Sequence, residues 1–341
     1  MDNELTLFDR LEVIKTTIAK YGEDNFYLSF SGGKDSTLLH YLLDEALPNN
    51  KIPRVYIDTG IEYLAIREFV MNLAKSDERI KIIKPSKPII PTLQKYGYPF
   101  KSKEFAKIVG SYQLQKDNIK KYLDMDKDEL KRYLLNHKEE EKALVGEGVF
   151  VLYYIKGIRG KRDKDGYITS FEDSVKYNCP KSLLYLFSDE YKVKTSNLCC
   201  TKLKKEPVHK WEKANGKTIA ITGMRRSEGG QRANIKGCII TDDSGKAVKF
   251  HPLLVVSDEW EEWYLKERGI KLCPLYYPPF NFKRTGCKGC PFALDLQEQL
   301  STMSLYLPKE REQCEFIWRP VYDEYRRIGY RLDKYEQMKM F

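Results

Sequence analysis

The sequence lacks a long hydrophobic run and lacks the basic, apolar and small-residue order of a secretion signal. Although 42% of its 341 residues are hydrophobic, no stretch reaches the roughly 18 apolar residues that a membrane-spanning helix needs. Residues 1–22 instead show an amphipathic helical pattern with acids early. We therefore expect a cytoplasmic protein with no membrane partner.

The chain also lacks internal repeats and low-complexity linkers, and it is long enough for one large α/β domain with additions. Its eight cysteines come without an export signal, so a disulfide framework is not expected, because cytosolic thiols stay reduced. The net charge of +10 is compatible with an anionic substrate, with nucleic acid or with a lysine-rich proteome, and does not choose between them.

Strand-like and helix-like segments alternate in the first part of the chain. Alternation of this kind predicts a doubly wound α/β fold with a mostly parallel sheet, whose ligands lie at the carboxyl ends of the strands. A β-hairpin is predicted further along, around Asp243 and Gly245. The predicted strands are 24–31, 51–60 and 79–87, and the predicted helices are 36–47 and 61–75.

Four regions are predicted from these patterns. The first part of the core occupies 1–100, and a charged helical and irregular insertion follows at 101–190. The second part of the core occupies 191–256, and a C-terminal helical region with cysteines occupies 257–341. The simplest interpretation of the charged helices at 101–142 is a solvated structural hairpin, and 160–173 resembles a polar turn region.

The segment Ser31–Ser36, S-G-G-K-D-S, joins the first strand to the next helix. Backbone N–H groups of a glycine turn at a helix N-terminus favour a phosphate, to which Lys34 adds charge. The spacing fits neither G-x-x-x-x-G-K-[ST] nor G-x-G-x-x-G. Two plainer alternatives remain: the glycines only connect the elements, and Asp35 or Ser36 only caps the helix.

At this point the residues resemble a family. "SFSGGKDSTLLHYLL" followed by "VYIDTGIE" is similar to the PP-loop ATP pyrophosphatases, in particular to the phosphoadenosine phosphosulfate (PAPS) reductase branch of the adenine nucleotide α-hydrolase-like proteins. "KYGYPFKSKEFA", "NLCCTKLKKEP", "ITGMRRSEGGQRA" and "FKRTGCKGCPFA" follow in the family's order. The resemblance implies a five-stranded parallel core that binds an adenine nucleotide such as ATP.

The resemblance also implies roles for particular residues. Lys34, Asp35 and Arg225 would be catalytic, with Lys34 and Arg225 stabilising phosphate charge and Asp35 or Asp58 assisting Mg²⁺. Arginine suits oxyanions because its planar fork binds them bidentately, although a solvated surface Arg225 is the plainer alternative. Arg226 and Arg232 are further phosphate or sulfate candidates. The nucleotide-binding set is Ser29, Ser31, Gly32, Gly33, Lys34, Asp35, Ser36, Asp58, Thr59, Gly60, Gly223 and Arg225.

The cysteines include two close pairs, Cys199 with Cys200 and Cys287 with Cys290. Four thiolates suit zinc or a [4Fe–4S] cluster. Adjacent side chains diverge by about 100° on a helix, which fits two irons better than one small ion, and the arrangement is similar to that of adenylyl-sulfate reductases. We expect a [4Fe–4S] cluster, with zinc as runner-up and small hydrophobic packing as the plain alternative. The other cysteines are single and are expected to be structural: Cys179, Cys238, Cys273 and Cys314. Of these, Cys238 and Cys314 are the two to be tested for redox roles.

Two features separate this chain from the reductases that it resembles. Residues 322–341 contain neither the cysteine nor the histidine of the reductase C-terminal motif, whereas the PP-loop is intact, as in members that cleave ATP. Three hypotheses follow. The first is ATP adenylation coupled to sulfur transfer, onto a nucleic-acid or other acceptor with a sulfur or electron donor protein. The second is reduction of adenylyl sulfate or PAPS, and the third is a non-catalytic nucleotide- and redox-sensing module.

Overall fold

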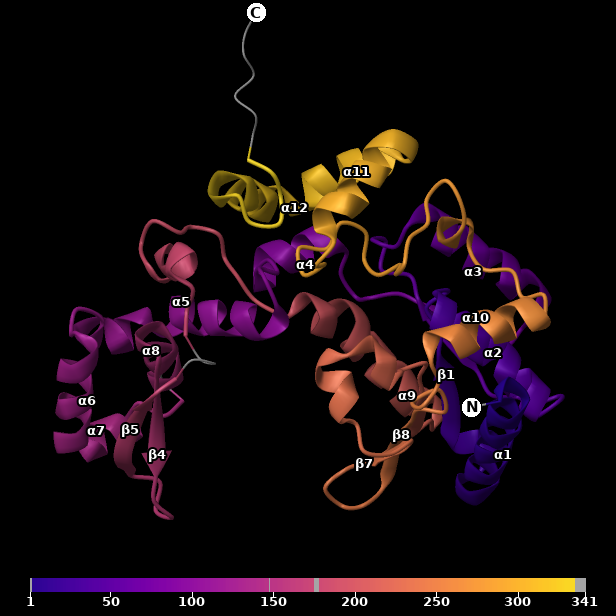
Figure 1. Cartoon of the computed structure of the whole chain (residues 1–341), viewed down its shortest axis with the longest axis horizontal. Coiled ribbons are helices and arrows are strands. Elements are labelled where there is room, and N and C mark those ends of the chain that lie inside the picture. Colours follow the sequence, from indigo (N-terminus) through magenta and orange to yellow (C-terminus); the bar gives the residue numbers. More distant parts are fainter. Residues whose placement is uncertain (1, 147, 175–177, 335–341) are drawn as a thin grey trace, which may run out of the picture. The chain divides into compact units, whose positions relative to one another are not determined.

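The computed structural model describes residues 2–146, 148–174 and 178–334 (Figure 1). The chain divides into two compact units, which are described separately. The first unit consists of Met1–Ile89, Cys200–Gly289 and Gln299–Cys314, and the second of Ile90–Cys199, Cys290–Glu298 and Glu315–Phe341. Within the described ranges, no helix has both the length and the hydropathy that crossing a membrane requires.

A six-stranded sheet forms the centre of the first unit, in the order β3-β2-β1-β6-β8-β7. Neighbouring strands are parallel except β7 and β8, which form the antiparallel hairpin predicted around Asp243 and Gly245. The predicted mostly parallel sheet is therefore confirmed, with five parallel strands and one antiparallel edge strand. The strands are β1 (Phe26–Ser29), β2 (Arg54–Ile57), β3 (Ile80–Ile83), β6 (Ile219–Ile221), β7 (Ile239–Thr241) and β8 (Ala247–Phe250).

Helices cover both faces of this sheet, because strand side chains point alternately to its two sides. Phe26 and Leu28 join the large core formed with α1 (Asn3–Tyr21), α2 (Lys34–Ala46), α3 (Leu64–Ser76) and α10 (Asp258–Glu267). Tyr27 points the other way and packs with Val208 and Trp211 of α9 (Glu206–Asn215). The fold is thus doubly wound as predicted, and Figure 1 shows α2 and α10 close to β1.

Short helical turns complete the first unit, and two late helices contain residues of both units. A π-helical turn, Thr201–Lys205, runs directly into α9, and such turns are frequent at functional sites. The 3₁₀ turns are η1 (Glu23–Asn25), η4 (Arg226–Glu228), η5 (Gly230–Asn234) and η6 (Pro274–Tyr276), and the late helices are α11 (Leu296–Tyr306) and α12 (Pro308–Ile328).

The second unit contains helices and a two-stranded sheet. Its elements are α4 (Ile89–Tyr96), α5 (Lys103–Leu123), α6 (Lys127–Asn136), α7 (Lys138–Ala143), α8 (Val149–Lys156), β4 (Ile158–Arg162), β5 (Ile168–Asp173) and η2 (Lys181–Phe187). The expectation of a turn region at 160–173 is wrong, because β4 and β5 form an antiparallel hairpin there. Buried Ile158 and Ile168 hold the hairpin beside α8. The charged residues between them obscure the strand pattern in the sequence.

Candidate functional site

Three loops with predicted site residues follow three adjacent parallel strands. Ser31–Ser36 follows β1, Asp58–Gly60 follows β2, and Gly223–Arg225 follows β6. In the strand order, β2 and β3 follow β1 in one direction, whereas β6 and β8 follow it in the opposite direction. The gap between β1 and β6 is therefore the switch point of the sheet, where open α/β folds bind ligands.

Gly32 turns the chain from β1 toward α2. Its φ of +70° favours glycine. A Cβ at this position would lie 2.6 Å from Cγ2 of Val70 and 3.2 Å from Cγ2 of Ile66, both in α3. A larger residue would therefore be strained in backbone and in packing, which is why the loop needs glycine here.

Helix α2 begins at Lys34, with Gly33 as its N-cap and no side-chain cap. The prediction that Asp35 or Ser36 caps the helix is wrong, because the helix starts before both. The Ser36 hydroxyl instead donates to the Gly33 carbonyl at 3.0 Å and lies 2.9 Å from the Ser31 hydroxyl. The two predicted phosphate-binding hydroxyls thus hold the loop in shape.

A tyrosine hydroxyl meets the first residue of α2. The Lys34 backbone N–H donates to the Tyr276 hydroxyl at 2.9 Å, and that hydroxyl lies 2.5 Å from Oγ1 of Thr285. Burial raises the pKa of Tyr276 to about 12, so this hydroxyl is neutral at physiological pH. Tyr276 therefore takes one of the N–H groups at the N-terminus of α2.

Five charged side chains form the cluster that we call the Glu261 cluster. Oε2 of Glu261 lies 2.8 Å from Nζ of Lys34 and 3.0 Å from Nη2 of Arg225. Nε of Arg225 donates to Oδ1 of Asp35 at 2.7 Å, and its Nη1 is paired with Asp258. The Arg225 side chain is 6% exposed and that of Glu261 is 0% exposed. Arg225 is therefore not a solvated surface residue.

Burial and, after it, the negative charge of Asp35 raise the pKa of Glu261 to about 7, against the opposing effect of Lys34 and Arg225. Sequence reasoning missed Glu261, Asp258 and Tyr276. Acids at the start of a predicted helix are typical of a solvated first turn, so the pattern carries no signal that Glu261 is buried.

The Arg-rich loop after β6 sends its arginines in different directions. Glu228 accepts from the Arg225 backbone N–H at 3.2 Å, is paired with Arg232 and lies 3.1 Å from Arg284. Arg226 instead donates to backbone carbonyls at 2.9 Å and is exposed. The structure therefore brings Arg232, but not Arg226, toward the charged groups around Arg225.

Gly223 lies directly against the N-terminal turn of α2. A Cβ on Gly223 would be 2.9 Å from Cβ of Asp35 and 3.1 Å from the Asp35 carbonyl. Because one of these atoms belongs to the backbone, α2 would have to shift to make room. The absence of a side chain at Gly223 thus allows the loop after β6 to approach the PP-loop.

The segment after β2 is held by its own contacts. Asp58 is 7% exposed and accepts from Nε of Arg67 at 3.2 Å. The Thr59 hydroxyl donates to Glu62 at 2.6 Å, and Gly60 has a φ of +79°. Both candidate carboxylates for Mg²⁺, Asp58 and Asp35, are therefore paired with arginines.

The four paired cysteines are divided between the units. Cys200 and Cys287 belong to the first unit, where both interact electrostatically with Lys204. Burial raises the pKa of Cys287, and a hydrogen bond with the Lys204 ammonium opposes the rise. Cys199 and Cys290 belong to the second unit. Four thiols are chemically suited to the expected cluster, but the described residues contain no group of three or more His, Cys, Asp or Glu side chains that could hold a metal ion.

The single cysteines are mostly buried, as expected for structural residues. Cys179, Cys273 and Cys314 are buried, and Cys238 is half-buried and accepts from Nη1 of Arg10 at 3.7 Å. Cys314 is 0% exposed. A bound sulfonucleotide therefore cannot reach its thiol without a change in the fold.

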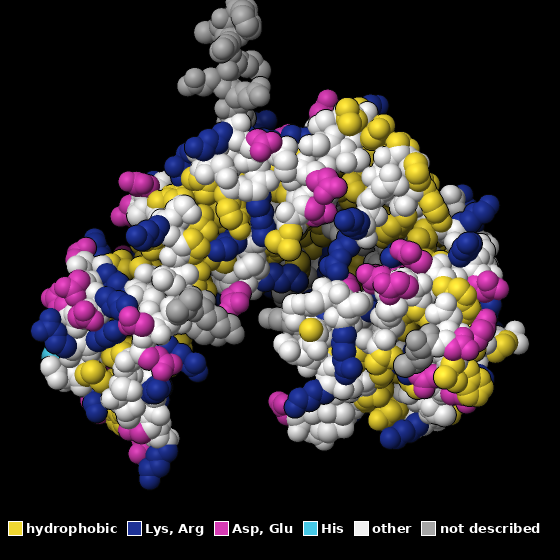
Figure 2. All heavy atoms as spheres, viewed as in Figure 1, with side chains coloured by type: hydrophobic (Ala, Val, Ile, Leu, Met, Phe, Trp, Pro, Cys, Tyr) yellow, Lys and Arg dark blue, Asp and Glu magenta, His cyan; other side chains and the backbone are white. Residues whose placement is uncertain are grey.

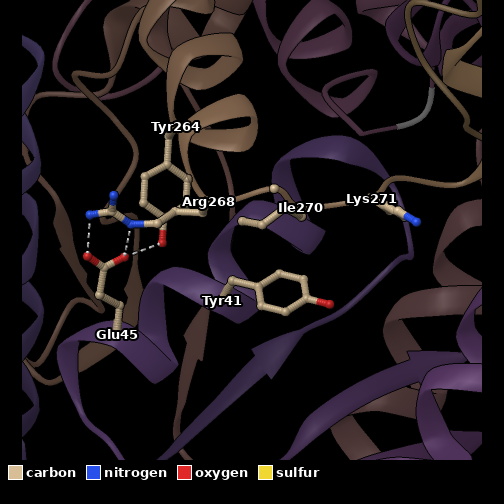
Figure 3. Close-up of a pocket in the computed structure, with 7 residues that line it drawn as sticks. Tyr41, Glu45, Tyr264, Arg268, Ile270 and Lys271 are labelled. Atoms are coloured by element: carbon tan, nitrogen blue, oxygen red, sulfur yellow. Dashed lines mark hydrogen bonds and ion pairs between the residues drawn. The ribbon is translucent and has the colours of Figure 1, made fainter.

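A pocket of about 400 Å³ lies at the other end of α2 and α10 (Figure 3). There Nη2 of Arg268 lies 2.8 Å from Oε1 of Glu45, and the Tyr264 hydroxyl donates to Oε2 of Glu45 at 2.8 Å. This pocket is about three turns along α2 from the PP-loop and contains none of the predicted site residues. Its lining is Tyr41, Glu45, Tyr264, Arg268, Gly269, Ile270 and Lys271.

Comparison with known proteins gives one relative of unknown role and several solved structures. An uncharacterized protein of Methanocaldococcus jannaschii is 30% identical over 124 residues, which are 33% of this chain and 30% of that protein's length. A phosphoadenylyl-sulfate reductase from Candida auris in a phosphate complex has 14% identity and a TM-score of 0.38, covering 81% of this chain and 93% of its own. 

Two other structures are similar at the same level. The FMN adenylyltransferase of Candida glabrata has 12% identity and a TM-score of 0.39, with 81% of this chain and 60% of that chain covered. The NH₃-dependent NAD synthetase of Campylobacter jejuni in complex with nitrate has 13% identity and a TM-score of 0.34, with 96% of both chains covered.

The family assignment rests on the match to a family model. The phosphoadenosine phosphosulfate reductase domain model matches residues 25–147 and 172–293, well over half of the chain. The matched segments include all three loops at the switch point and the four paired cysteines. The chain therefore belongs to the phosphoadenosine phosphosulfate reductase family.

Proposed function

We propose that this protein binds ATP and cleaves it to AMP and pyrophosphate, adenylating a substrate in a sulfur-transfer reaction. One observation carries the proposal: Lys34, from the loop after β1, and Arg225, from the loop after β6, converge on Glu261 at the switch point, within 2.8 and 3.0 Å. Two cations beside a helix N-terminus form a site suited to the phosphates of a nucleotide.

The chemistry would depend on position and charge. An acceptor oxygen would attack the α-phosphorus, the bond from that phosphorus to the bridging oxygen would break, and pyrophosphate would leave. A sulfur nucleophile from the donor would then form a bond to the adenylated acceptor, and AMP would leave with the acceptor oxygen. Lys34 and the planar fork of Arg225 would neutralise the charge that develops on the phosphates. Mg²⁺ is usually bound by one or two carboxylates together with substrate phosphates, and Asp35 would supply one carboxylate after exchanging Arg225 for the ion.

The test is incubation with ATP labelled in the adenine ring and, separately, in the γ-phosphate. Release of AMP and pyrophosphate, and its loss in Lys34→Ala and Arg225→Ala, would support the proposal. Glu45→Gln is the control, since Glu45 lies at the far end of α2. Release of ADP and phosphate, or of no product with any candidate acceptor, would contradict it. Tight binding without any product would favour the non-catalytic sensing module.

Reduction of adenylyl sulfate or PAPS is the second candidate, and the family match favours it. Such an enzyme needs an accessible thiol to attack sulfur, and the late cysteine outside the two pairs, Cys314, is 0% exposed. Sulfite release from adenylyl sulfate or PAPS in the presence of thioredoxin would support this candidate. Sulfite release that persists in Cys314→Ser would assign the thiol elsewhere.

We also propose that Cys199, Cys200, Cys287 and Cys290 hold a [4Fe–4S] cluster, with zinc as runner-up. The paired spacing supports this, as does the electrostatic interaction of Cys200 with Cys287. Such a group would supply electrons or a sulfide for transfer. Anaerobically purified protein should show the visible absorption of an iron–sulfur cluster, which Cys287→Ala should abolish and Cys273→Ala should retain. Colourless protein with stoichiometric zinc would contradict the cluster.

A nucleic-acid sulfur acceptor is supported by the net charge of +10 alone. On the face shown in Figure 2, Lys and Arg side chains are interspersed with Asp and Glu side chains. The acceptor proposal predicts RNA or DNA binding that weakens steeply with salt. Absence of such binding would leave a small-molecule or protein acceptor.

A further inference from the structure

We infer that Glu261 is a positioning residue that holds Lys34 and Arg225 together when no phosphate is bound, and that it releases them to a phosphate by taking up one proton. This inference deepens the proposed function and rests on it for the identity of the ligand. No sequence motif points to Glu261; the packing of α10 against α2 places it there.

The contacts of Glu261 support this role. One carboxylate oxygen, Oε2, lies 2.8 Å from the Lys34 ammonium and 3.0 Å from the Arg225 guanidinium. Both cations come from loops at the switch point, and Glu261 is the carboxylate that both of them contact. Glu261 is 0% exposed, so protein atoms and not water surround it. The carboxylate therefore occupies the position, relative to the cations, that a phosphate oxygen would take.

Other charged groups around Glu261 make its negative charge costly. Asp35 approaches from α2 and Asp258 from the first turn of α10 itself, and both are paired with Arg225. Arg232, from η5, also interacts with Arg225 and Asp35. Burial and Asp35 raise the pKa of Glu261 to about 7, against the effect of Lys34 and Arg225. Near neutral pH this carboxyl group therefore takes up a proton much more readily than an ordinary glutamate does.

A phosphate at Lys34 and Arg225 would add negative charge beside Glu261 and draw the cations toward itself. Both effects favour the neutral carboxyl group, so the bound state holds a proton, taken from solvent, that the free protein lacks above about pH 7. By linkage, affinity then falls as pH rises above 7, by at most about tenfold per pH unit for one proton. A role for Glu261 in folding alone predicts no such proton uptake.

The experiment is isothermal titration calorimetry at pH 8 in two buffers of different ionisation enthalpy, with ATP and with inorganic pyrophosphate as probes. The difference between the buffers measures the protons taken up. The phosphate groups of both probes also exchange protons near this pH, and that exchange is common to all variants. We therefore expect the wild type to take up between one half and one proton more than Glu261→Gln. Glu261→Asp, which keeps the carboxyl group, should restore part of the uptake.

Glu45→Gln is the matched control, because Glu45 is on α2, as Lys34 is, and contacts Tyr264 of α10 and Arg268 directly after it (Figure 3). It should behave as the wild type. Proton uptake that is the same in the wild type and in Glu261→Gln would overturn the inference. If pyrophosphate binding shows the Glu261-dependent uptake but ATP does not bind, the inference holds and the proposed function fails. If ATP binds without Glu261-dependent uptake, the inference fails, and the release of AMP and pyrophosphate decides the proposed function separately. If neither probe binds, both fail.

Discussion

The two ends of the α2–α10 pair carry the same kind of interaction in different surroundings. At the PP-loop end, Lys34 of α2 meets Glu261 of α10, whose side chains are 21% and 0% exposed. At the far end the charges are reversed, because Glu45 of α2 meets Arg268, the residue directly after α10, and these side chains are 28% and 34% exposed. The partners are similar in distance, at 2.8 Å in both pairs, so the difference lies in contact with water.

This difference changes the chemistry of the two carboxylates. The hydrogen bond from Arg268 lowers the pKa of Glu45, which therefore stays ionised and stabilises the fold in the ordinary way. Burial raises the pKa of Glu261 to about 7, although it faces two cations. An ion pair in contact with water contributes little to the free energy of unfolding. A buried ion pair, in contrast, can take up a proton and release its cations to a ligand.

The largest difference between the two ends is expected in the free energy of unfolding when the arginine at each end is replaced. Arg225→Ala leaves Asp35, Asp258 and Glu261 without their shared cation in a buried site, and should lower the free energy of unfolding by about 3–5 kcal/mol. Arg268→Ala breaks an exposed pair and should cost about 0–1 kcal/mol. Denaturant unfolding of both variants measures the difference. Equal losses would show that burial does not distinguish the two ends.

The pH dependence of stability should have opposite signs at the two ends. The folded pKa of Glu261 is raised from 4.5 to about 7, so its contribution is complete below about pH 4.5 and is lost as pH rises through 7. Relative to Glu261→Gln, the wild type should lose on the order of 2 kcal/mol over that window. The pKa of Glu45 is lowered, so its contribution is present above about pH 4.5 and is lost as pH falls. Relative to Glu45→Gln, the wild type should therefore gain stability as pH rises.

These differences are measured as melting temperatures of wild type and variant at each pH. Comparison with a variant is needed because burial lowers the pKa of His40 and of His251 to about 4, which makes the fold of every variant less stable below about pH 6.5. Slopes of the same sign for Glu261→Gln and Glu45→Gln would contradict the contrast between the two ends.

Close packing at the PP-loop end predicts a smaller effect. In Gly223→Ala the new Cβ would lie 2.9 Å from Cβ of Asp35, and moving α2 to relieve this should cost about 1–3 kcal/mol and weaken phosphate binding. In Gly237→Ala the nearest neighbouring atom is the Ile239 carbonyl oxygen at 3.8 Å, so little change is expected. Thermal unfolding and a pyrophosphate titration test both variants. A stable, fully binding Gly223→Ala protein would contradict the close approach.

The smallest effect is expected from the tyrosine hydroxyls at the two ends. Tyr264→Phe removes one hydrogen bond, to Glu45, and Tyr276→Phe removes two, with Lys34 and with Thr285, at about 1 kcal/mol for each hydrogen bond. Only Tyr276→Phe frees a backbone N–H at the PP-loop, so its pyrophosphate affinity should rise by about fivefold, the equivalent of one hydrogen bond. Lower affinity in Tyr276→Phe would instead show that the hydroxyl itself contacts the ligand.

Much of the fold was predictable because its signals are local. The alternation of apolar strands with amphipathic helices around "SGGKDS" predicted the parallel sheet, and Asp243 to Gly245 predicted the β7–β8 hairpin. The β4–β5 hairpin was missed because its strands mix buried Ile158 and Ile168 with charged residues. In that segment the packing against α8 overrides the weak strand pattern.

The candidate site was predictable only in its backbone and its cations. Motif resemblance pointed to Ser31–Ser36 and Arg225, and the topology brings them together at the switch point. The prediction that Asp35 or Ser36 caps α2 is wrong, since Asp35 pairs with Arg225 and Ser36 braces the loop. The residues that contact them from α10 and η6, Glu261 and Tyr276, were not predicted.

The sequence by itself determined a strand, a glycine turn and a helix whose first turn carries Lys34, because φ preferences and hydrophobic periodicity act over neighbouring residues. Only the tertiary structure decided that Glu261, more than two hundred positions away in the chain, is the partner of that lysine. The physical reason is desolvation: the pKa of a carboxyl group depends on the water and charges around it, and these are set when α10 packs on α2.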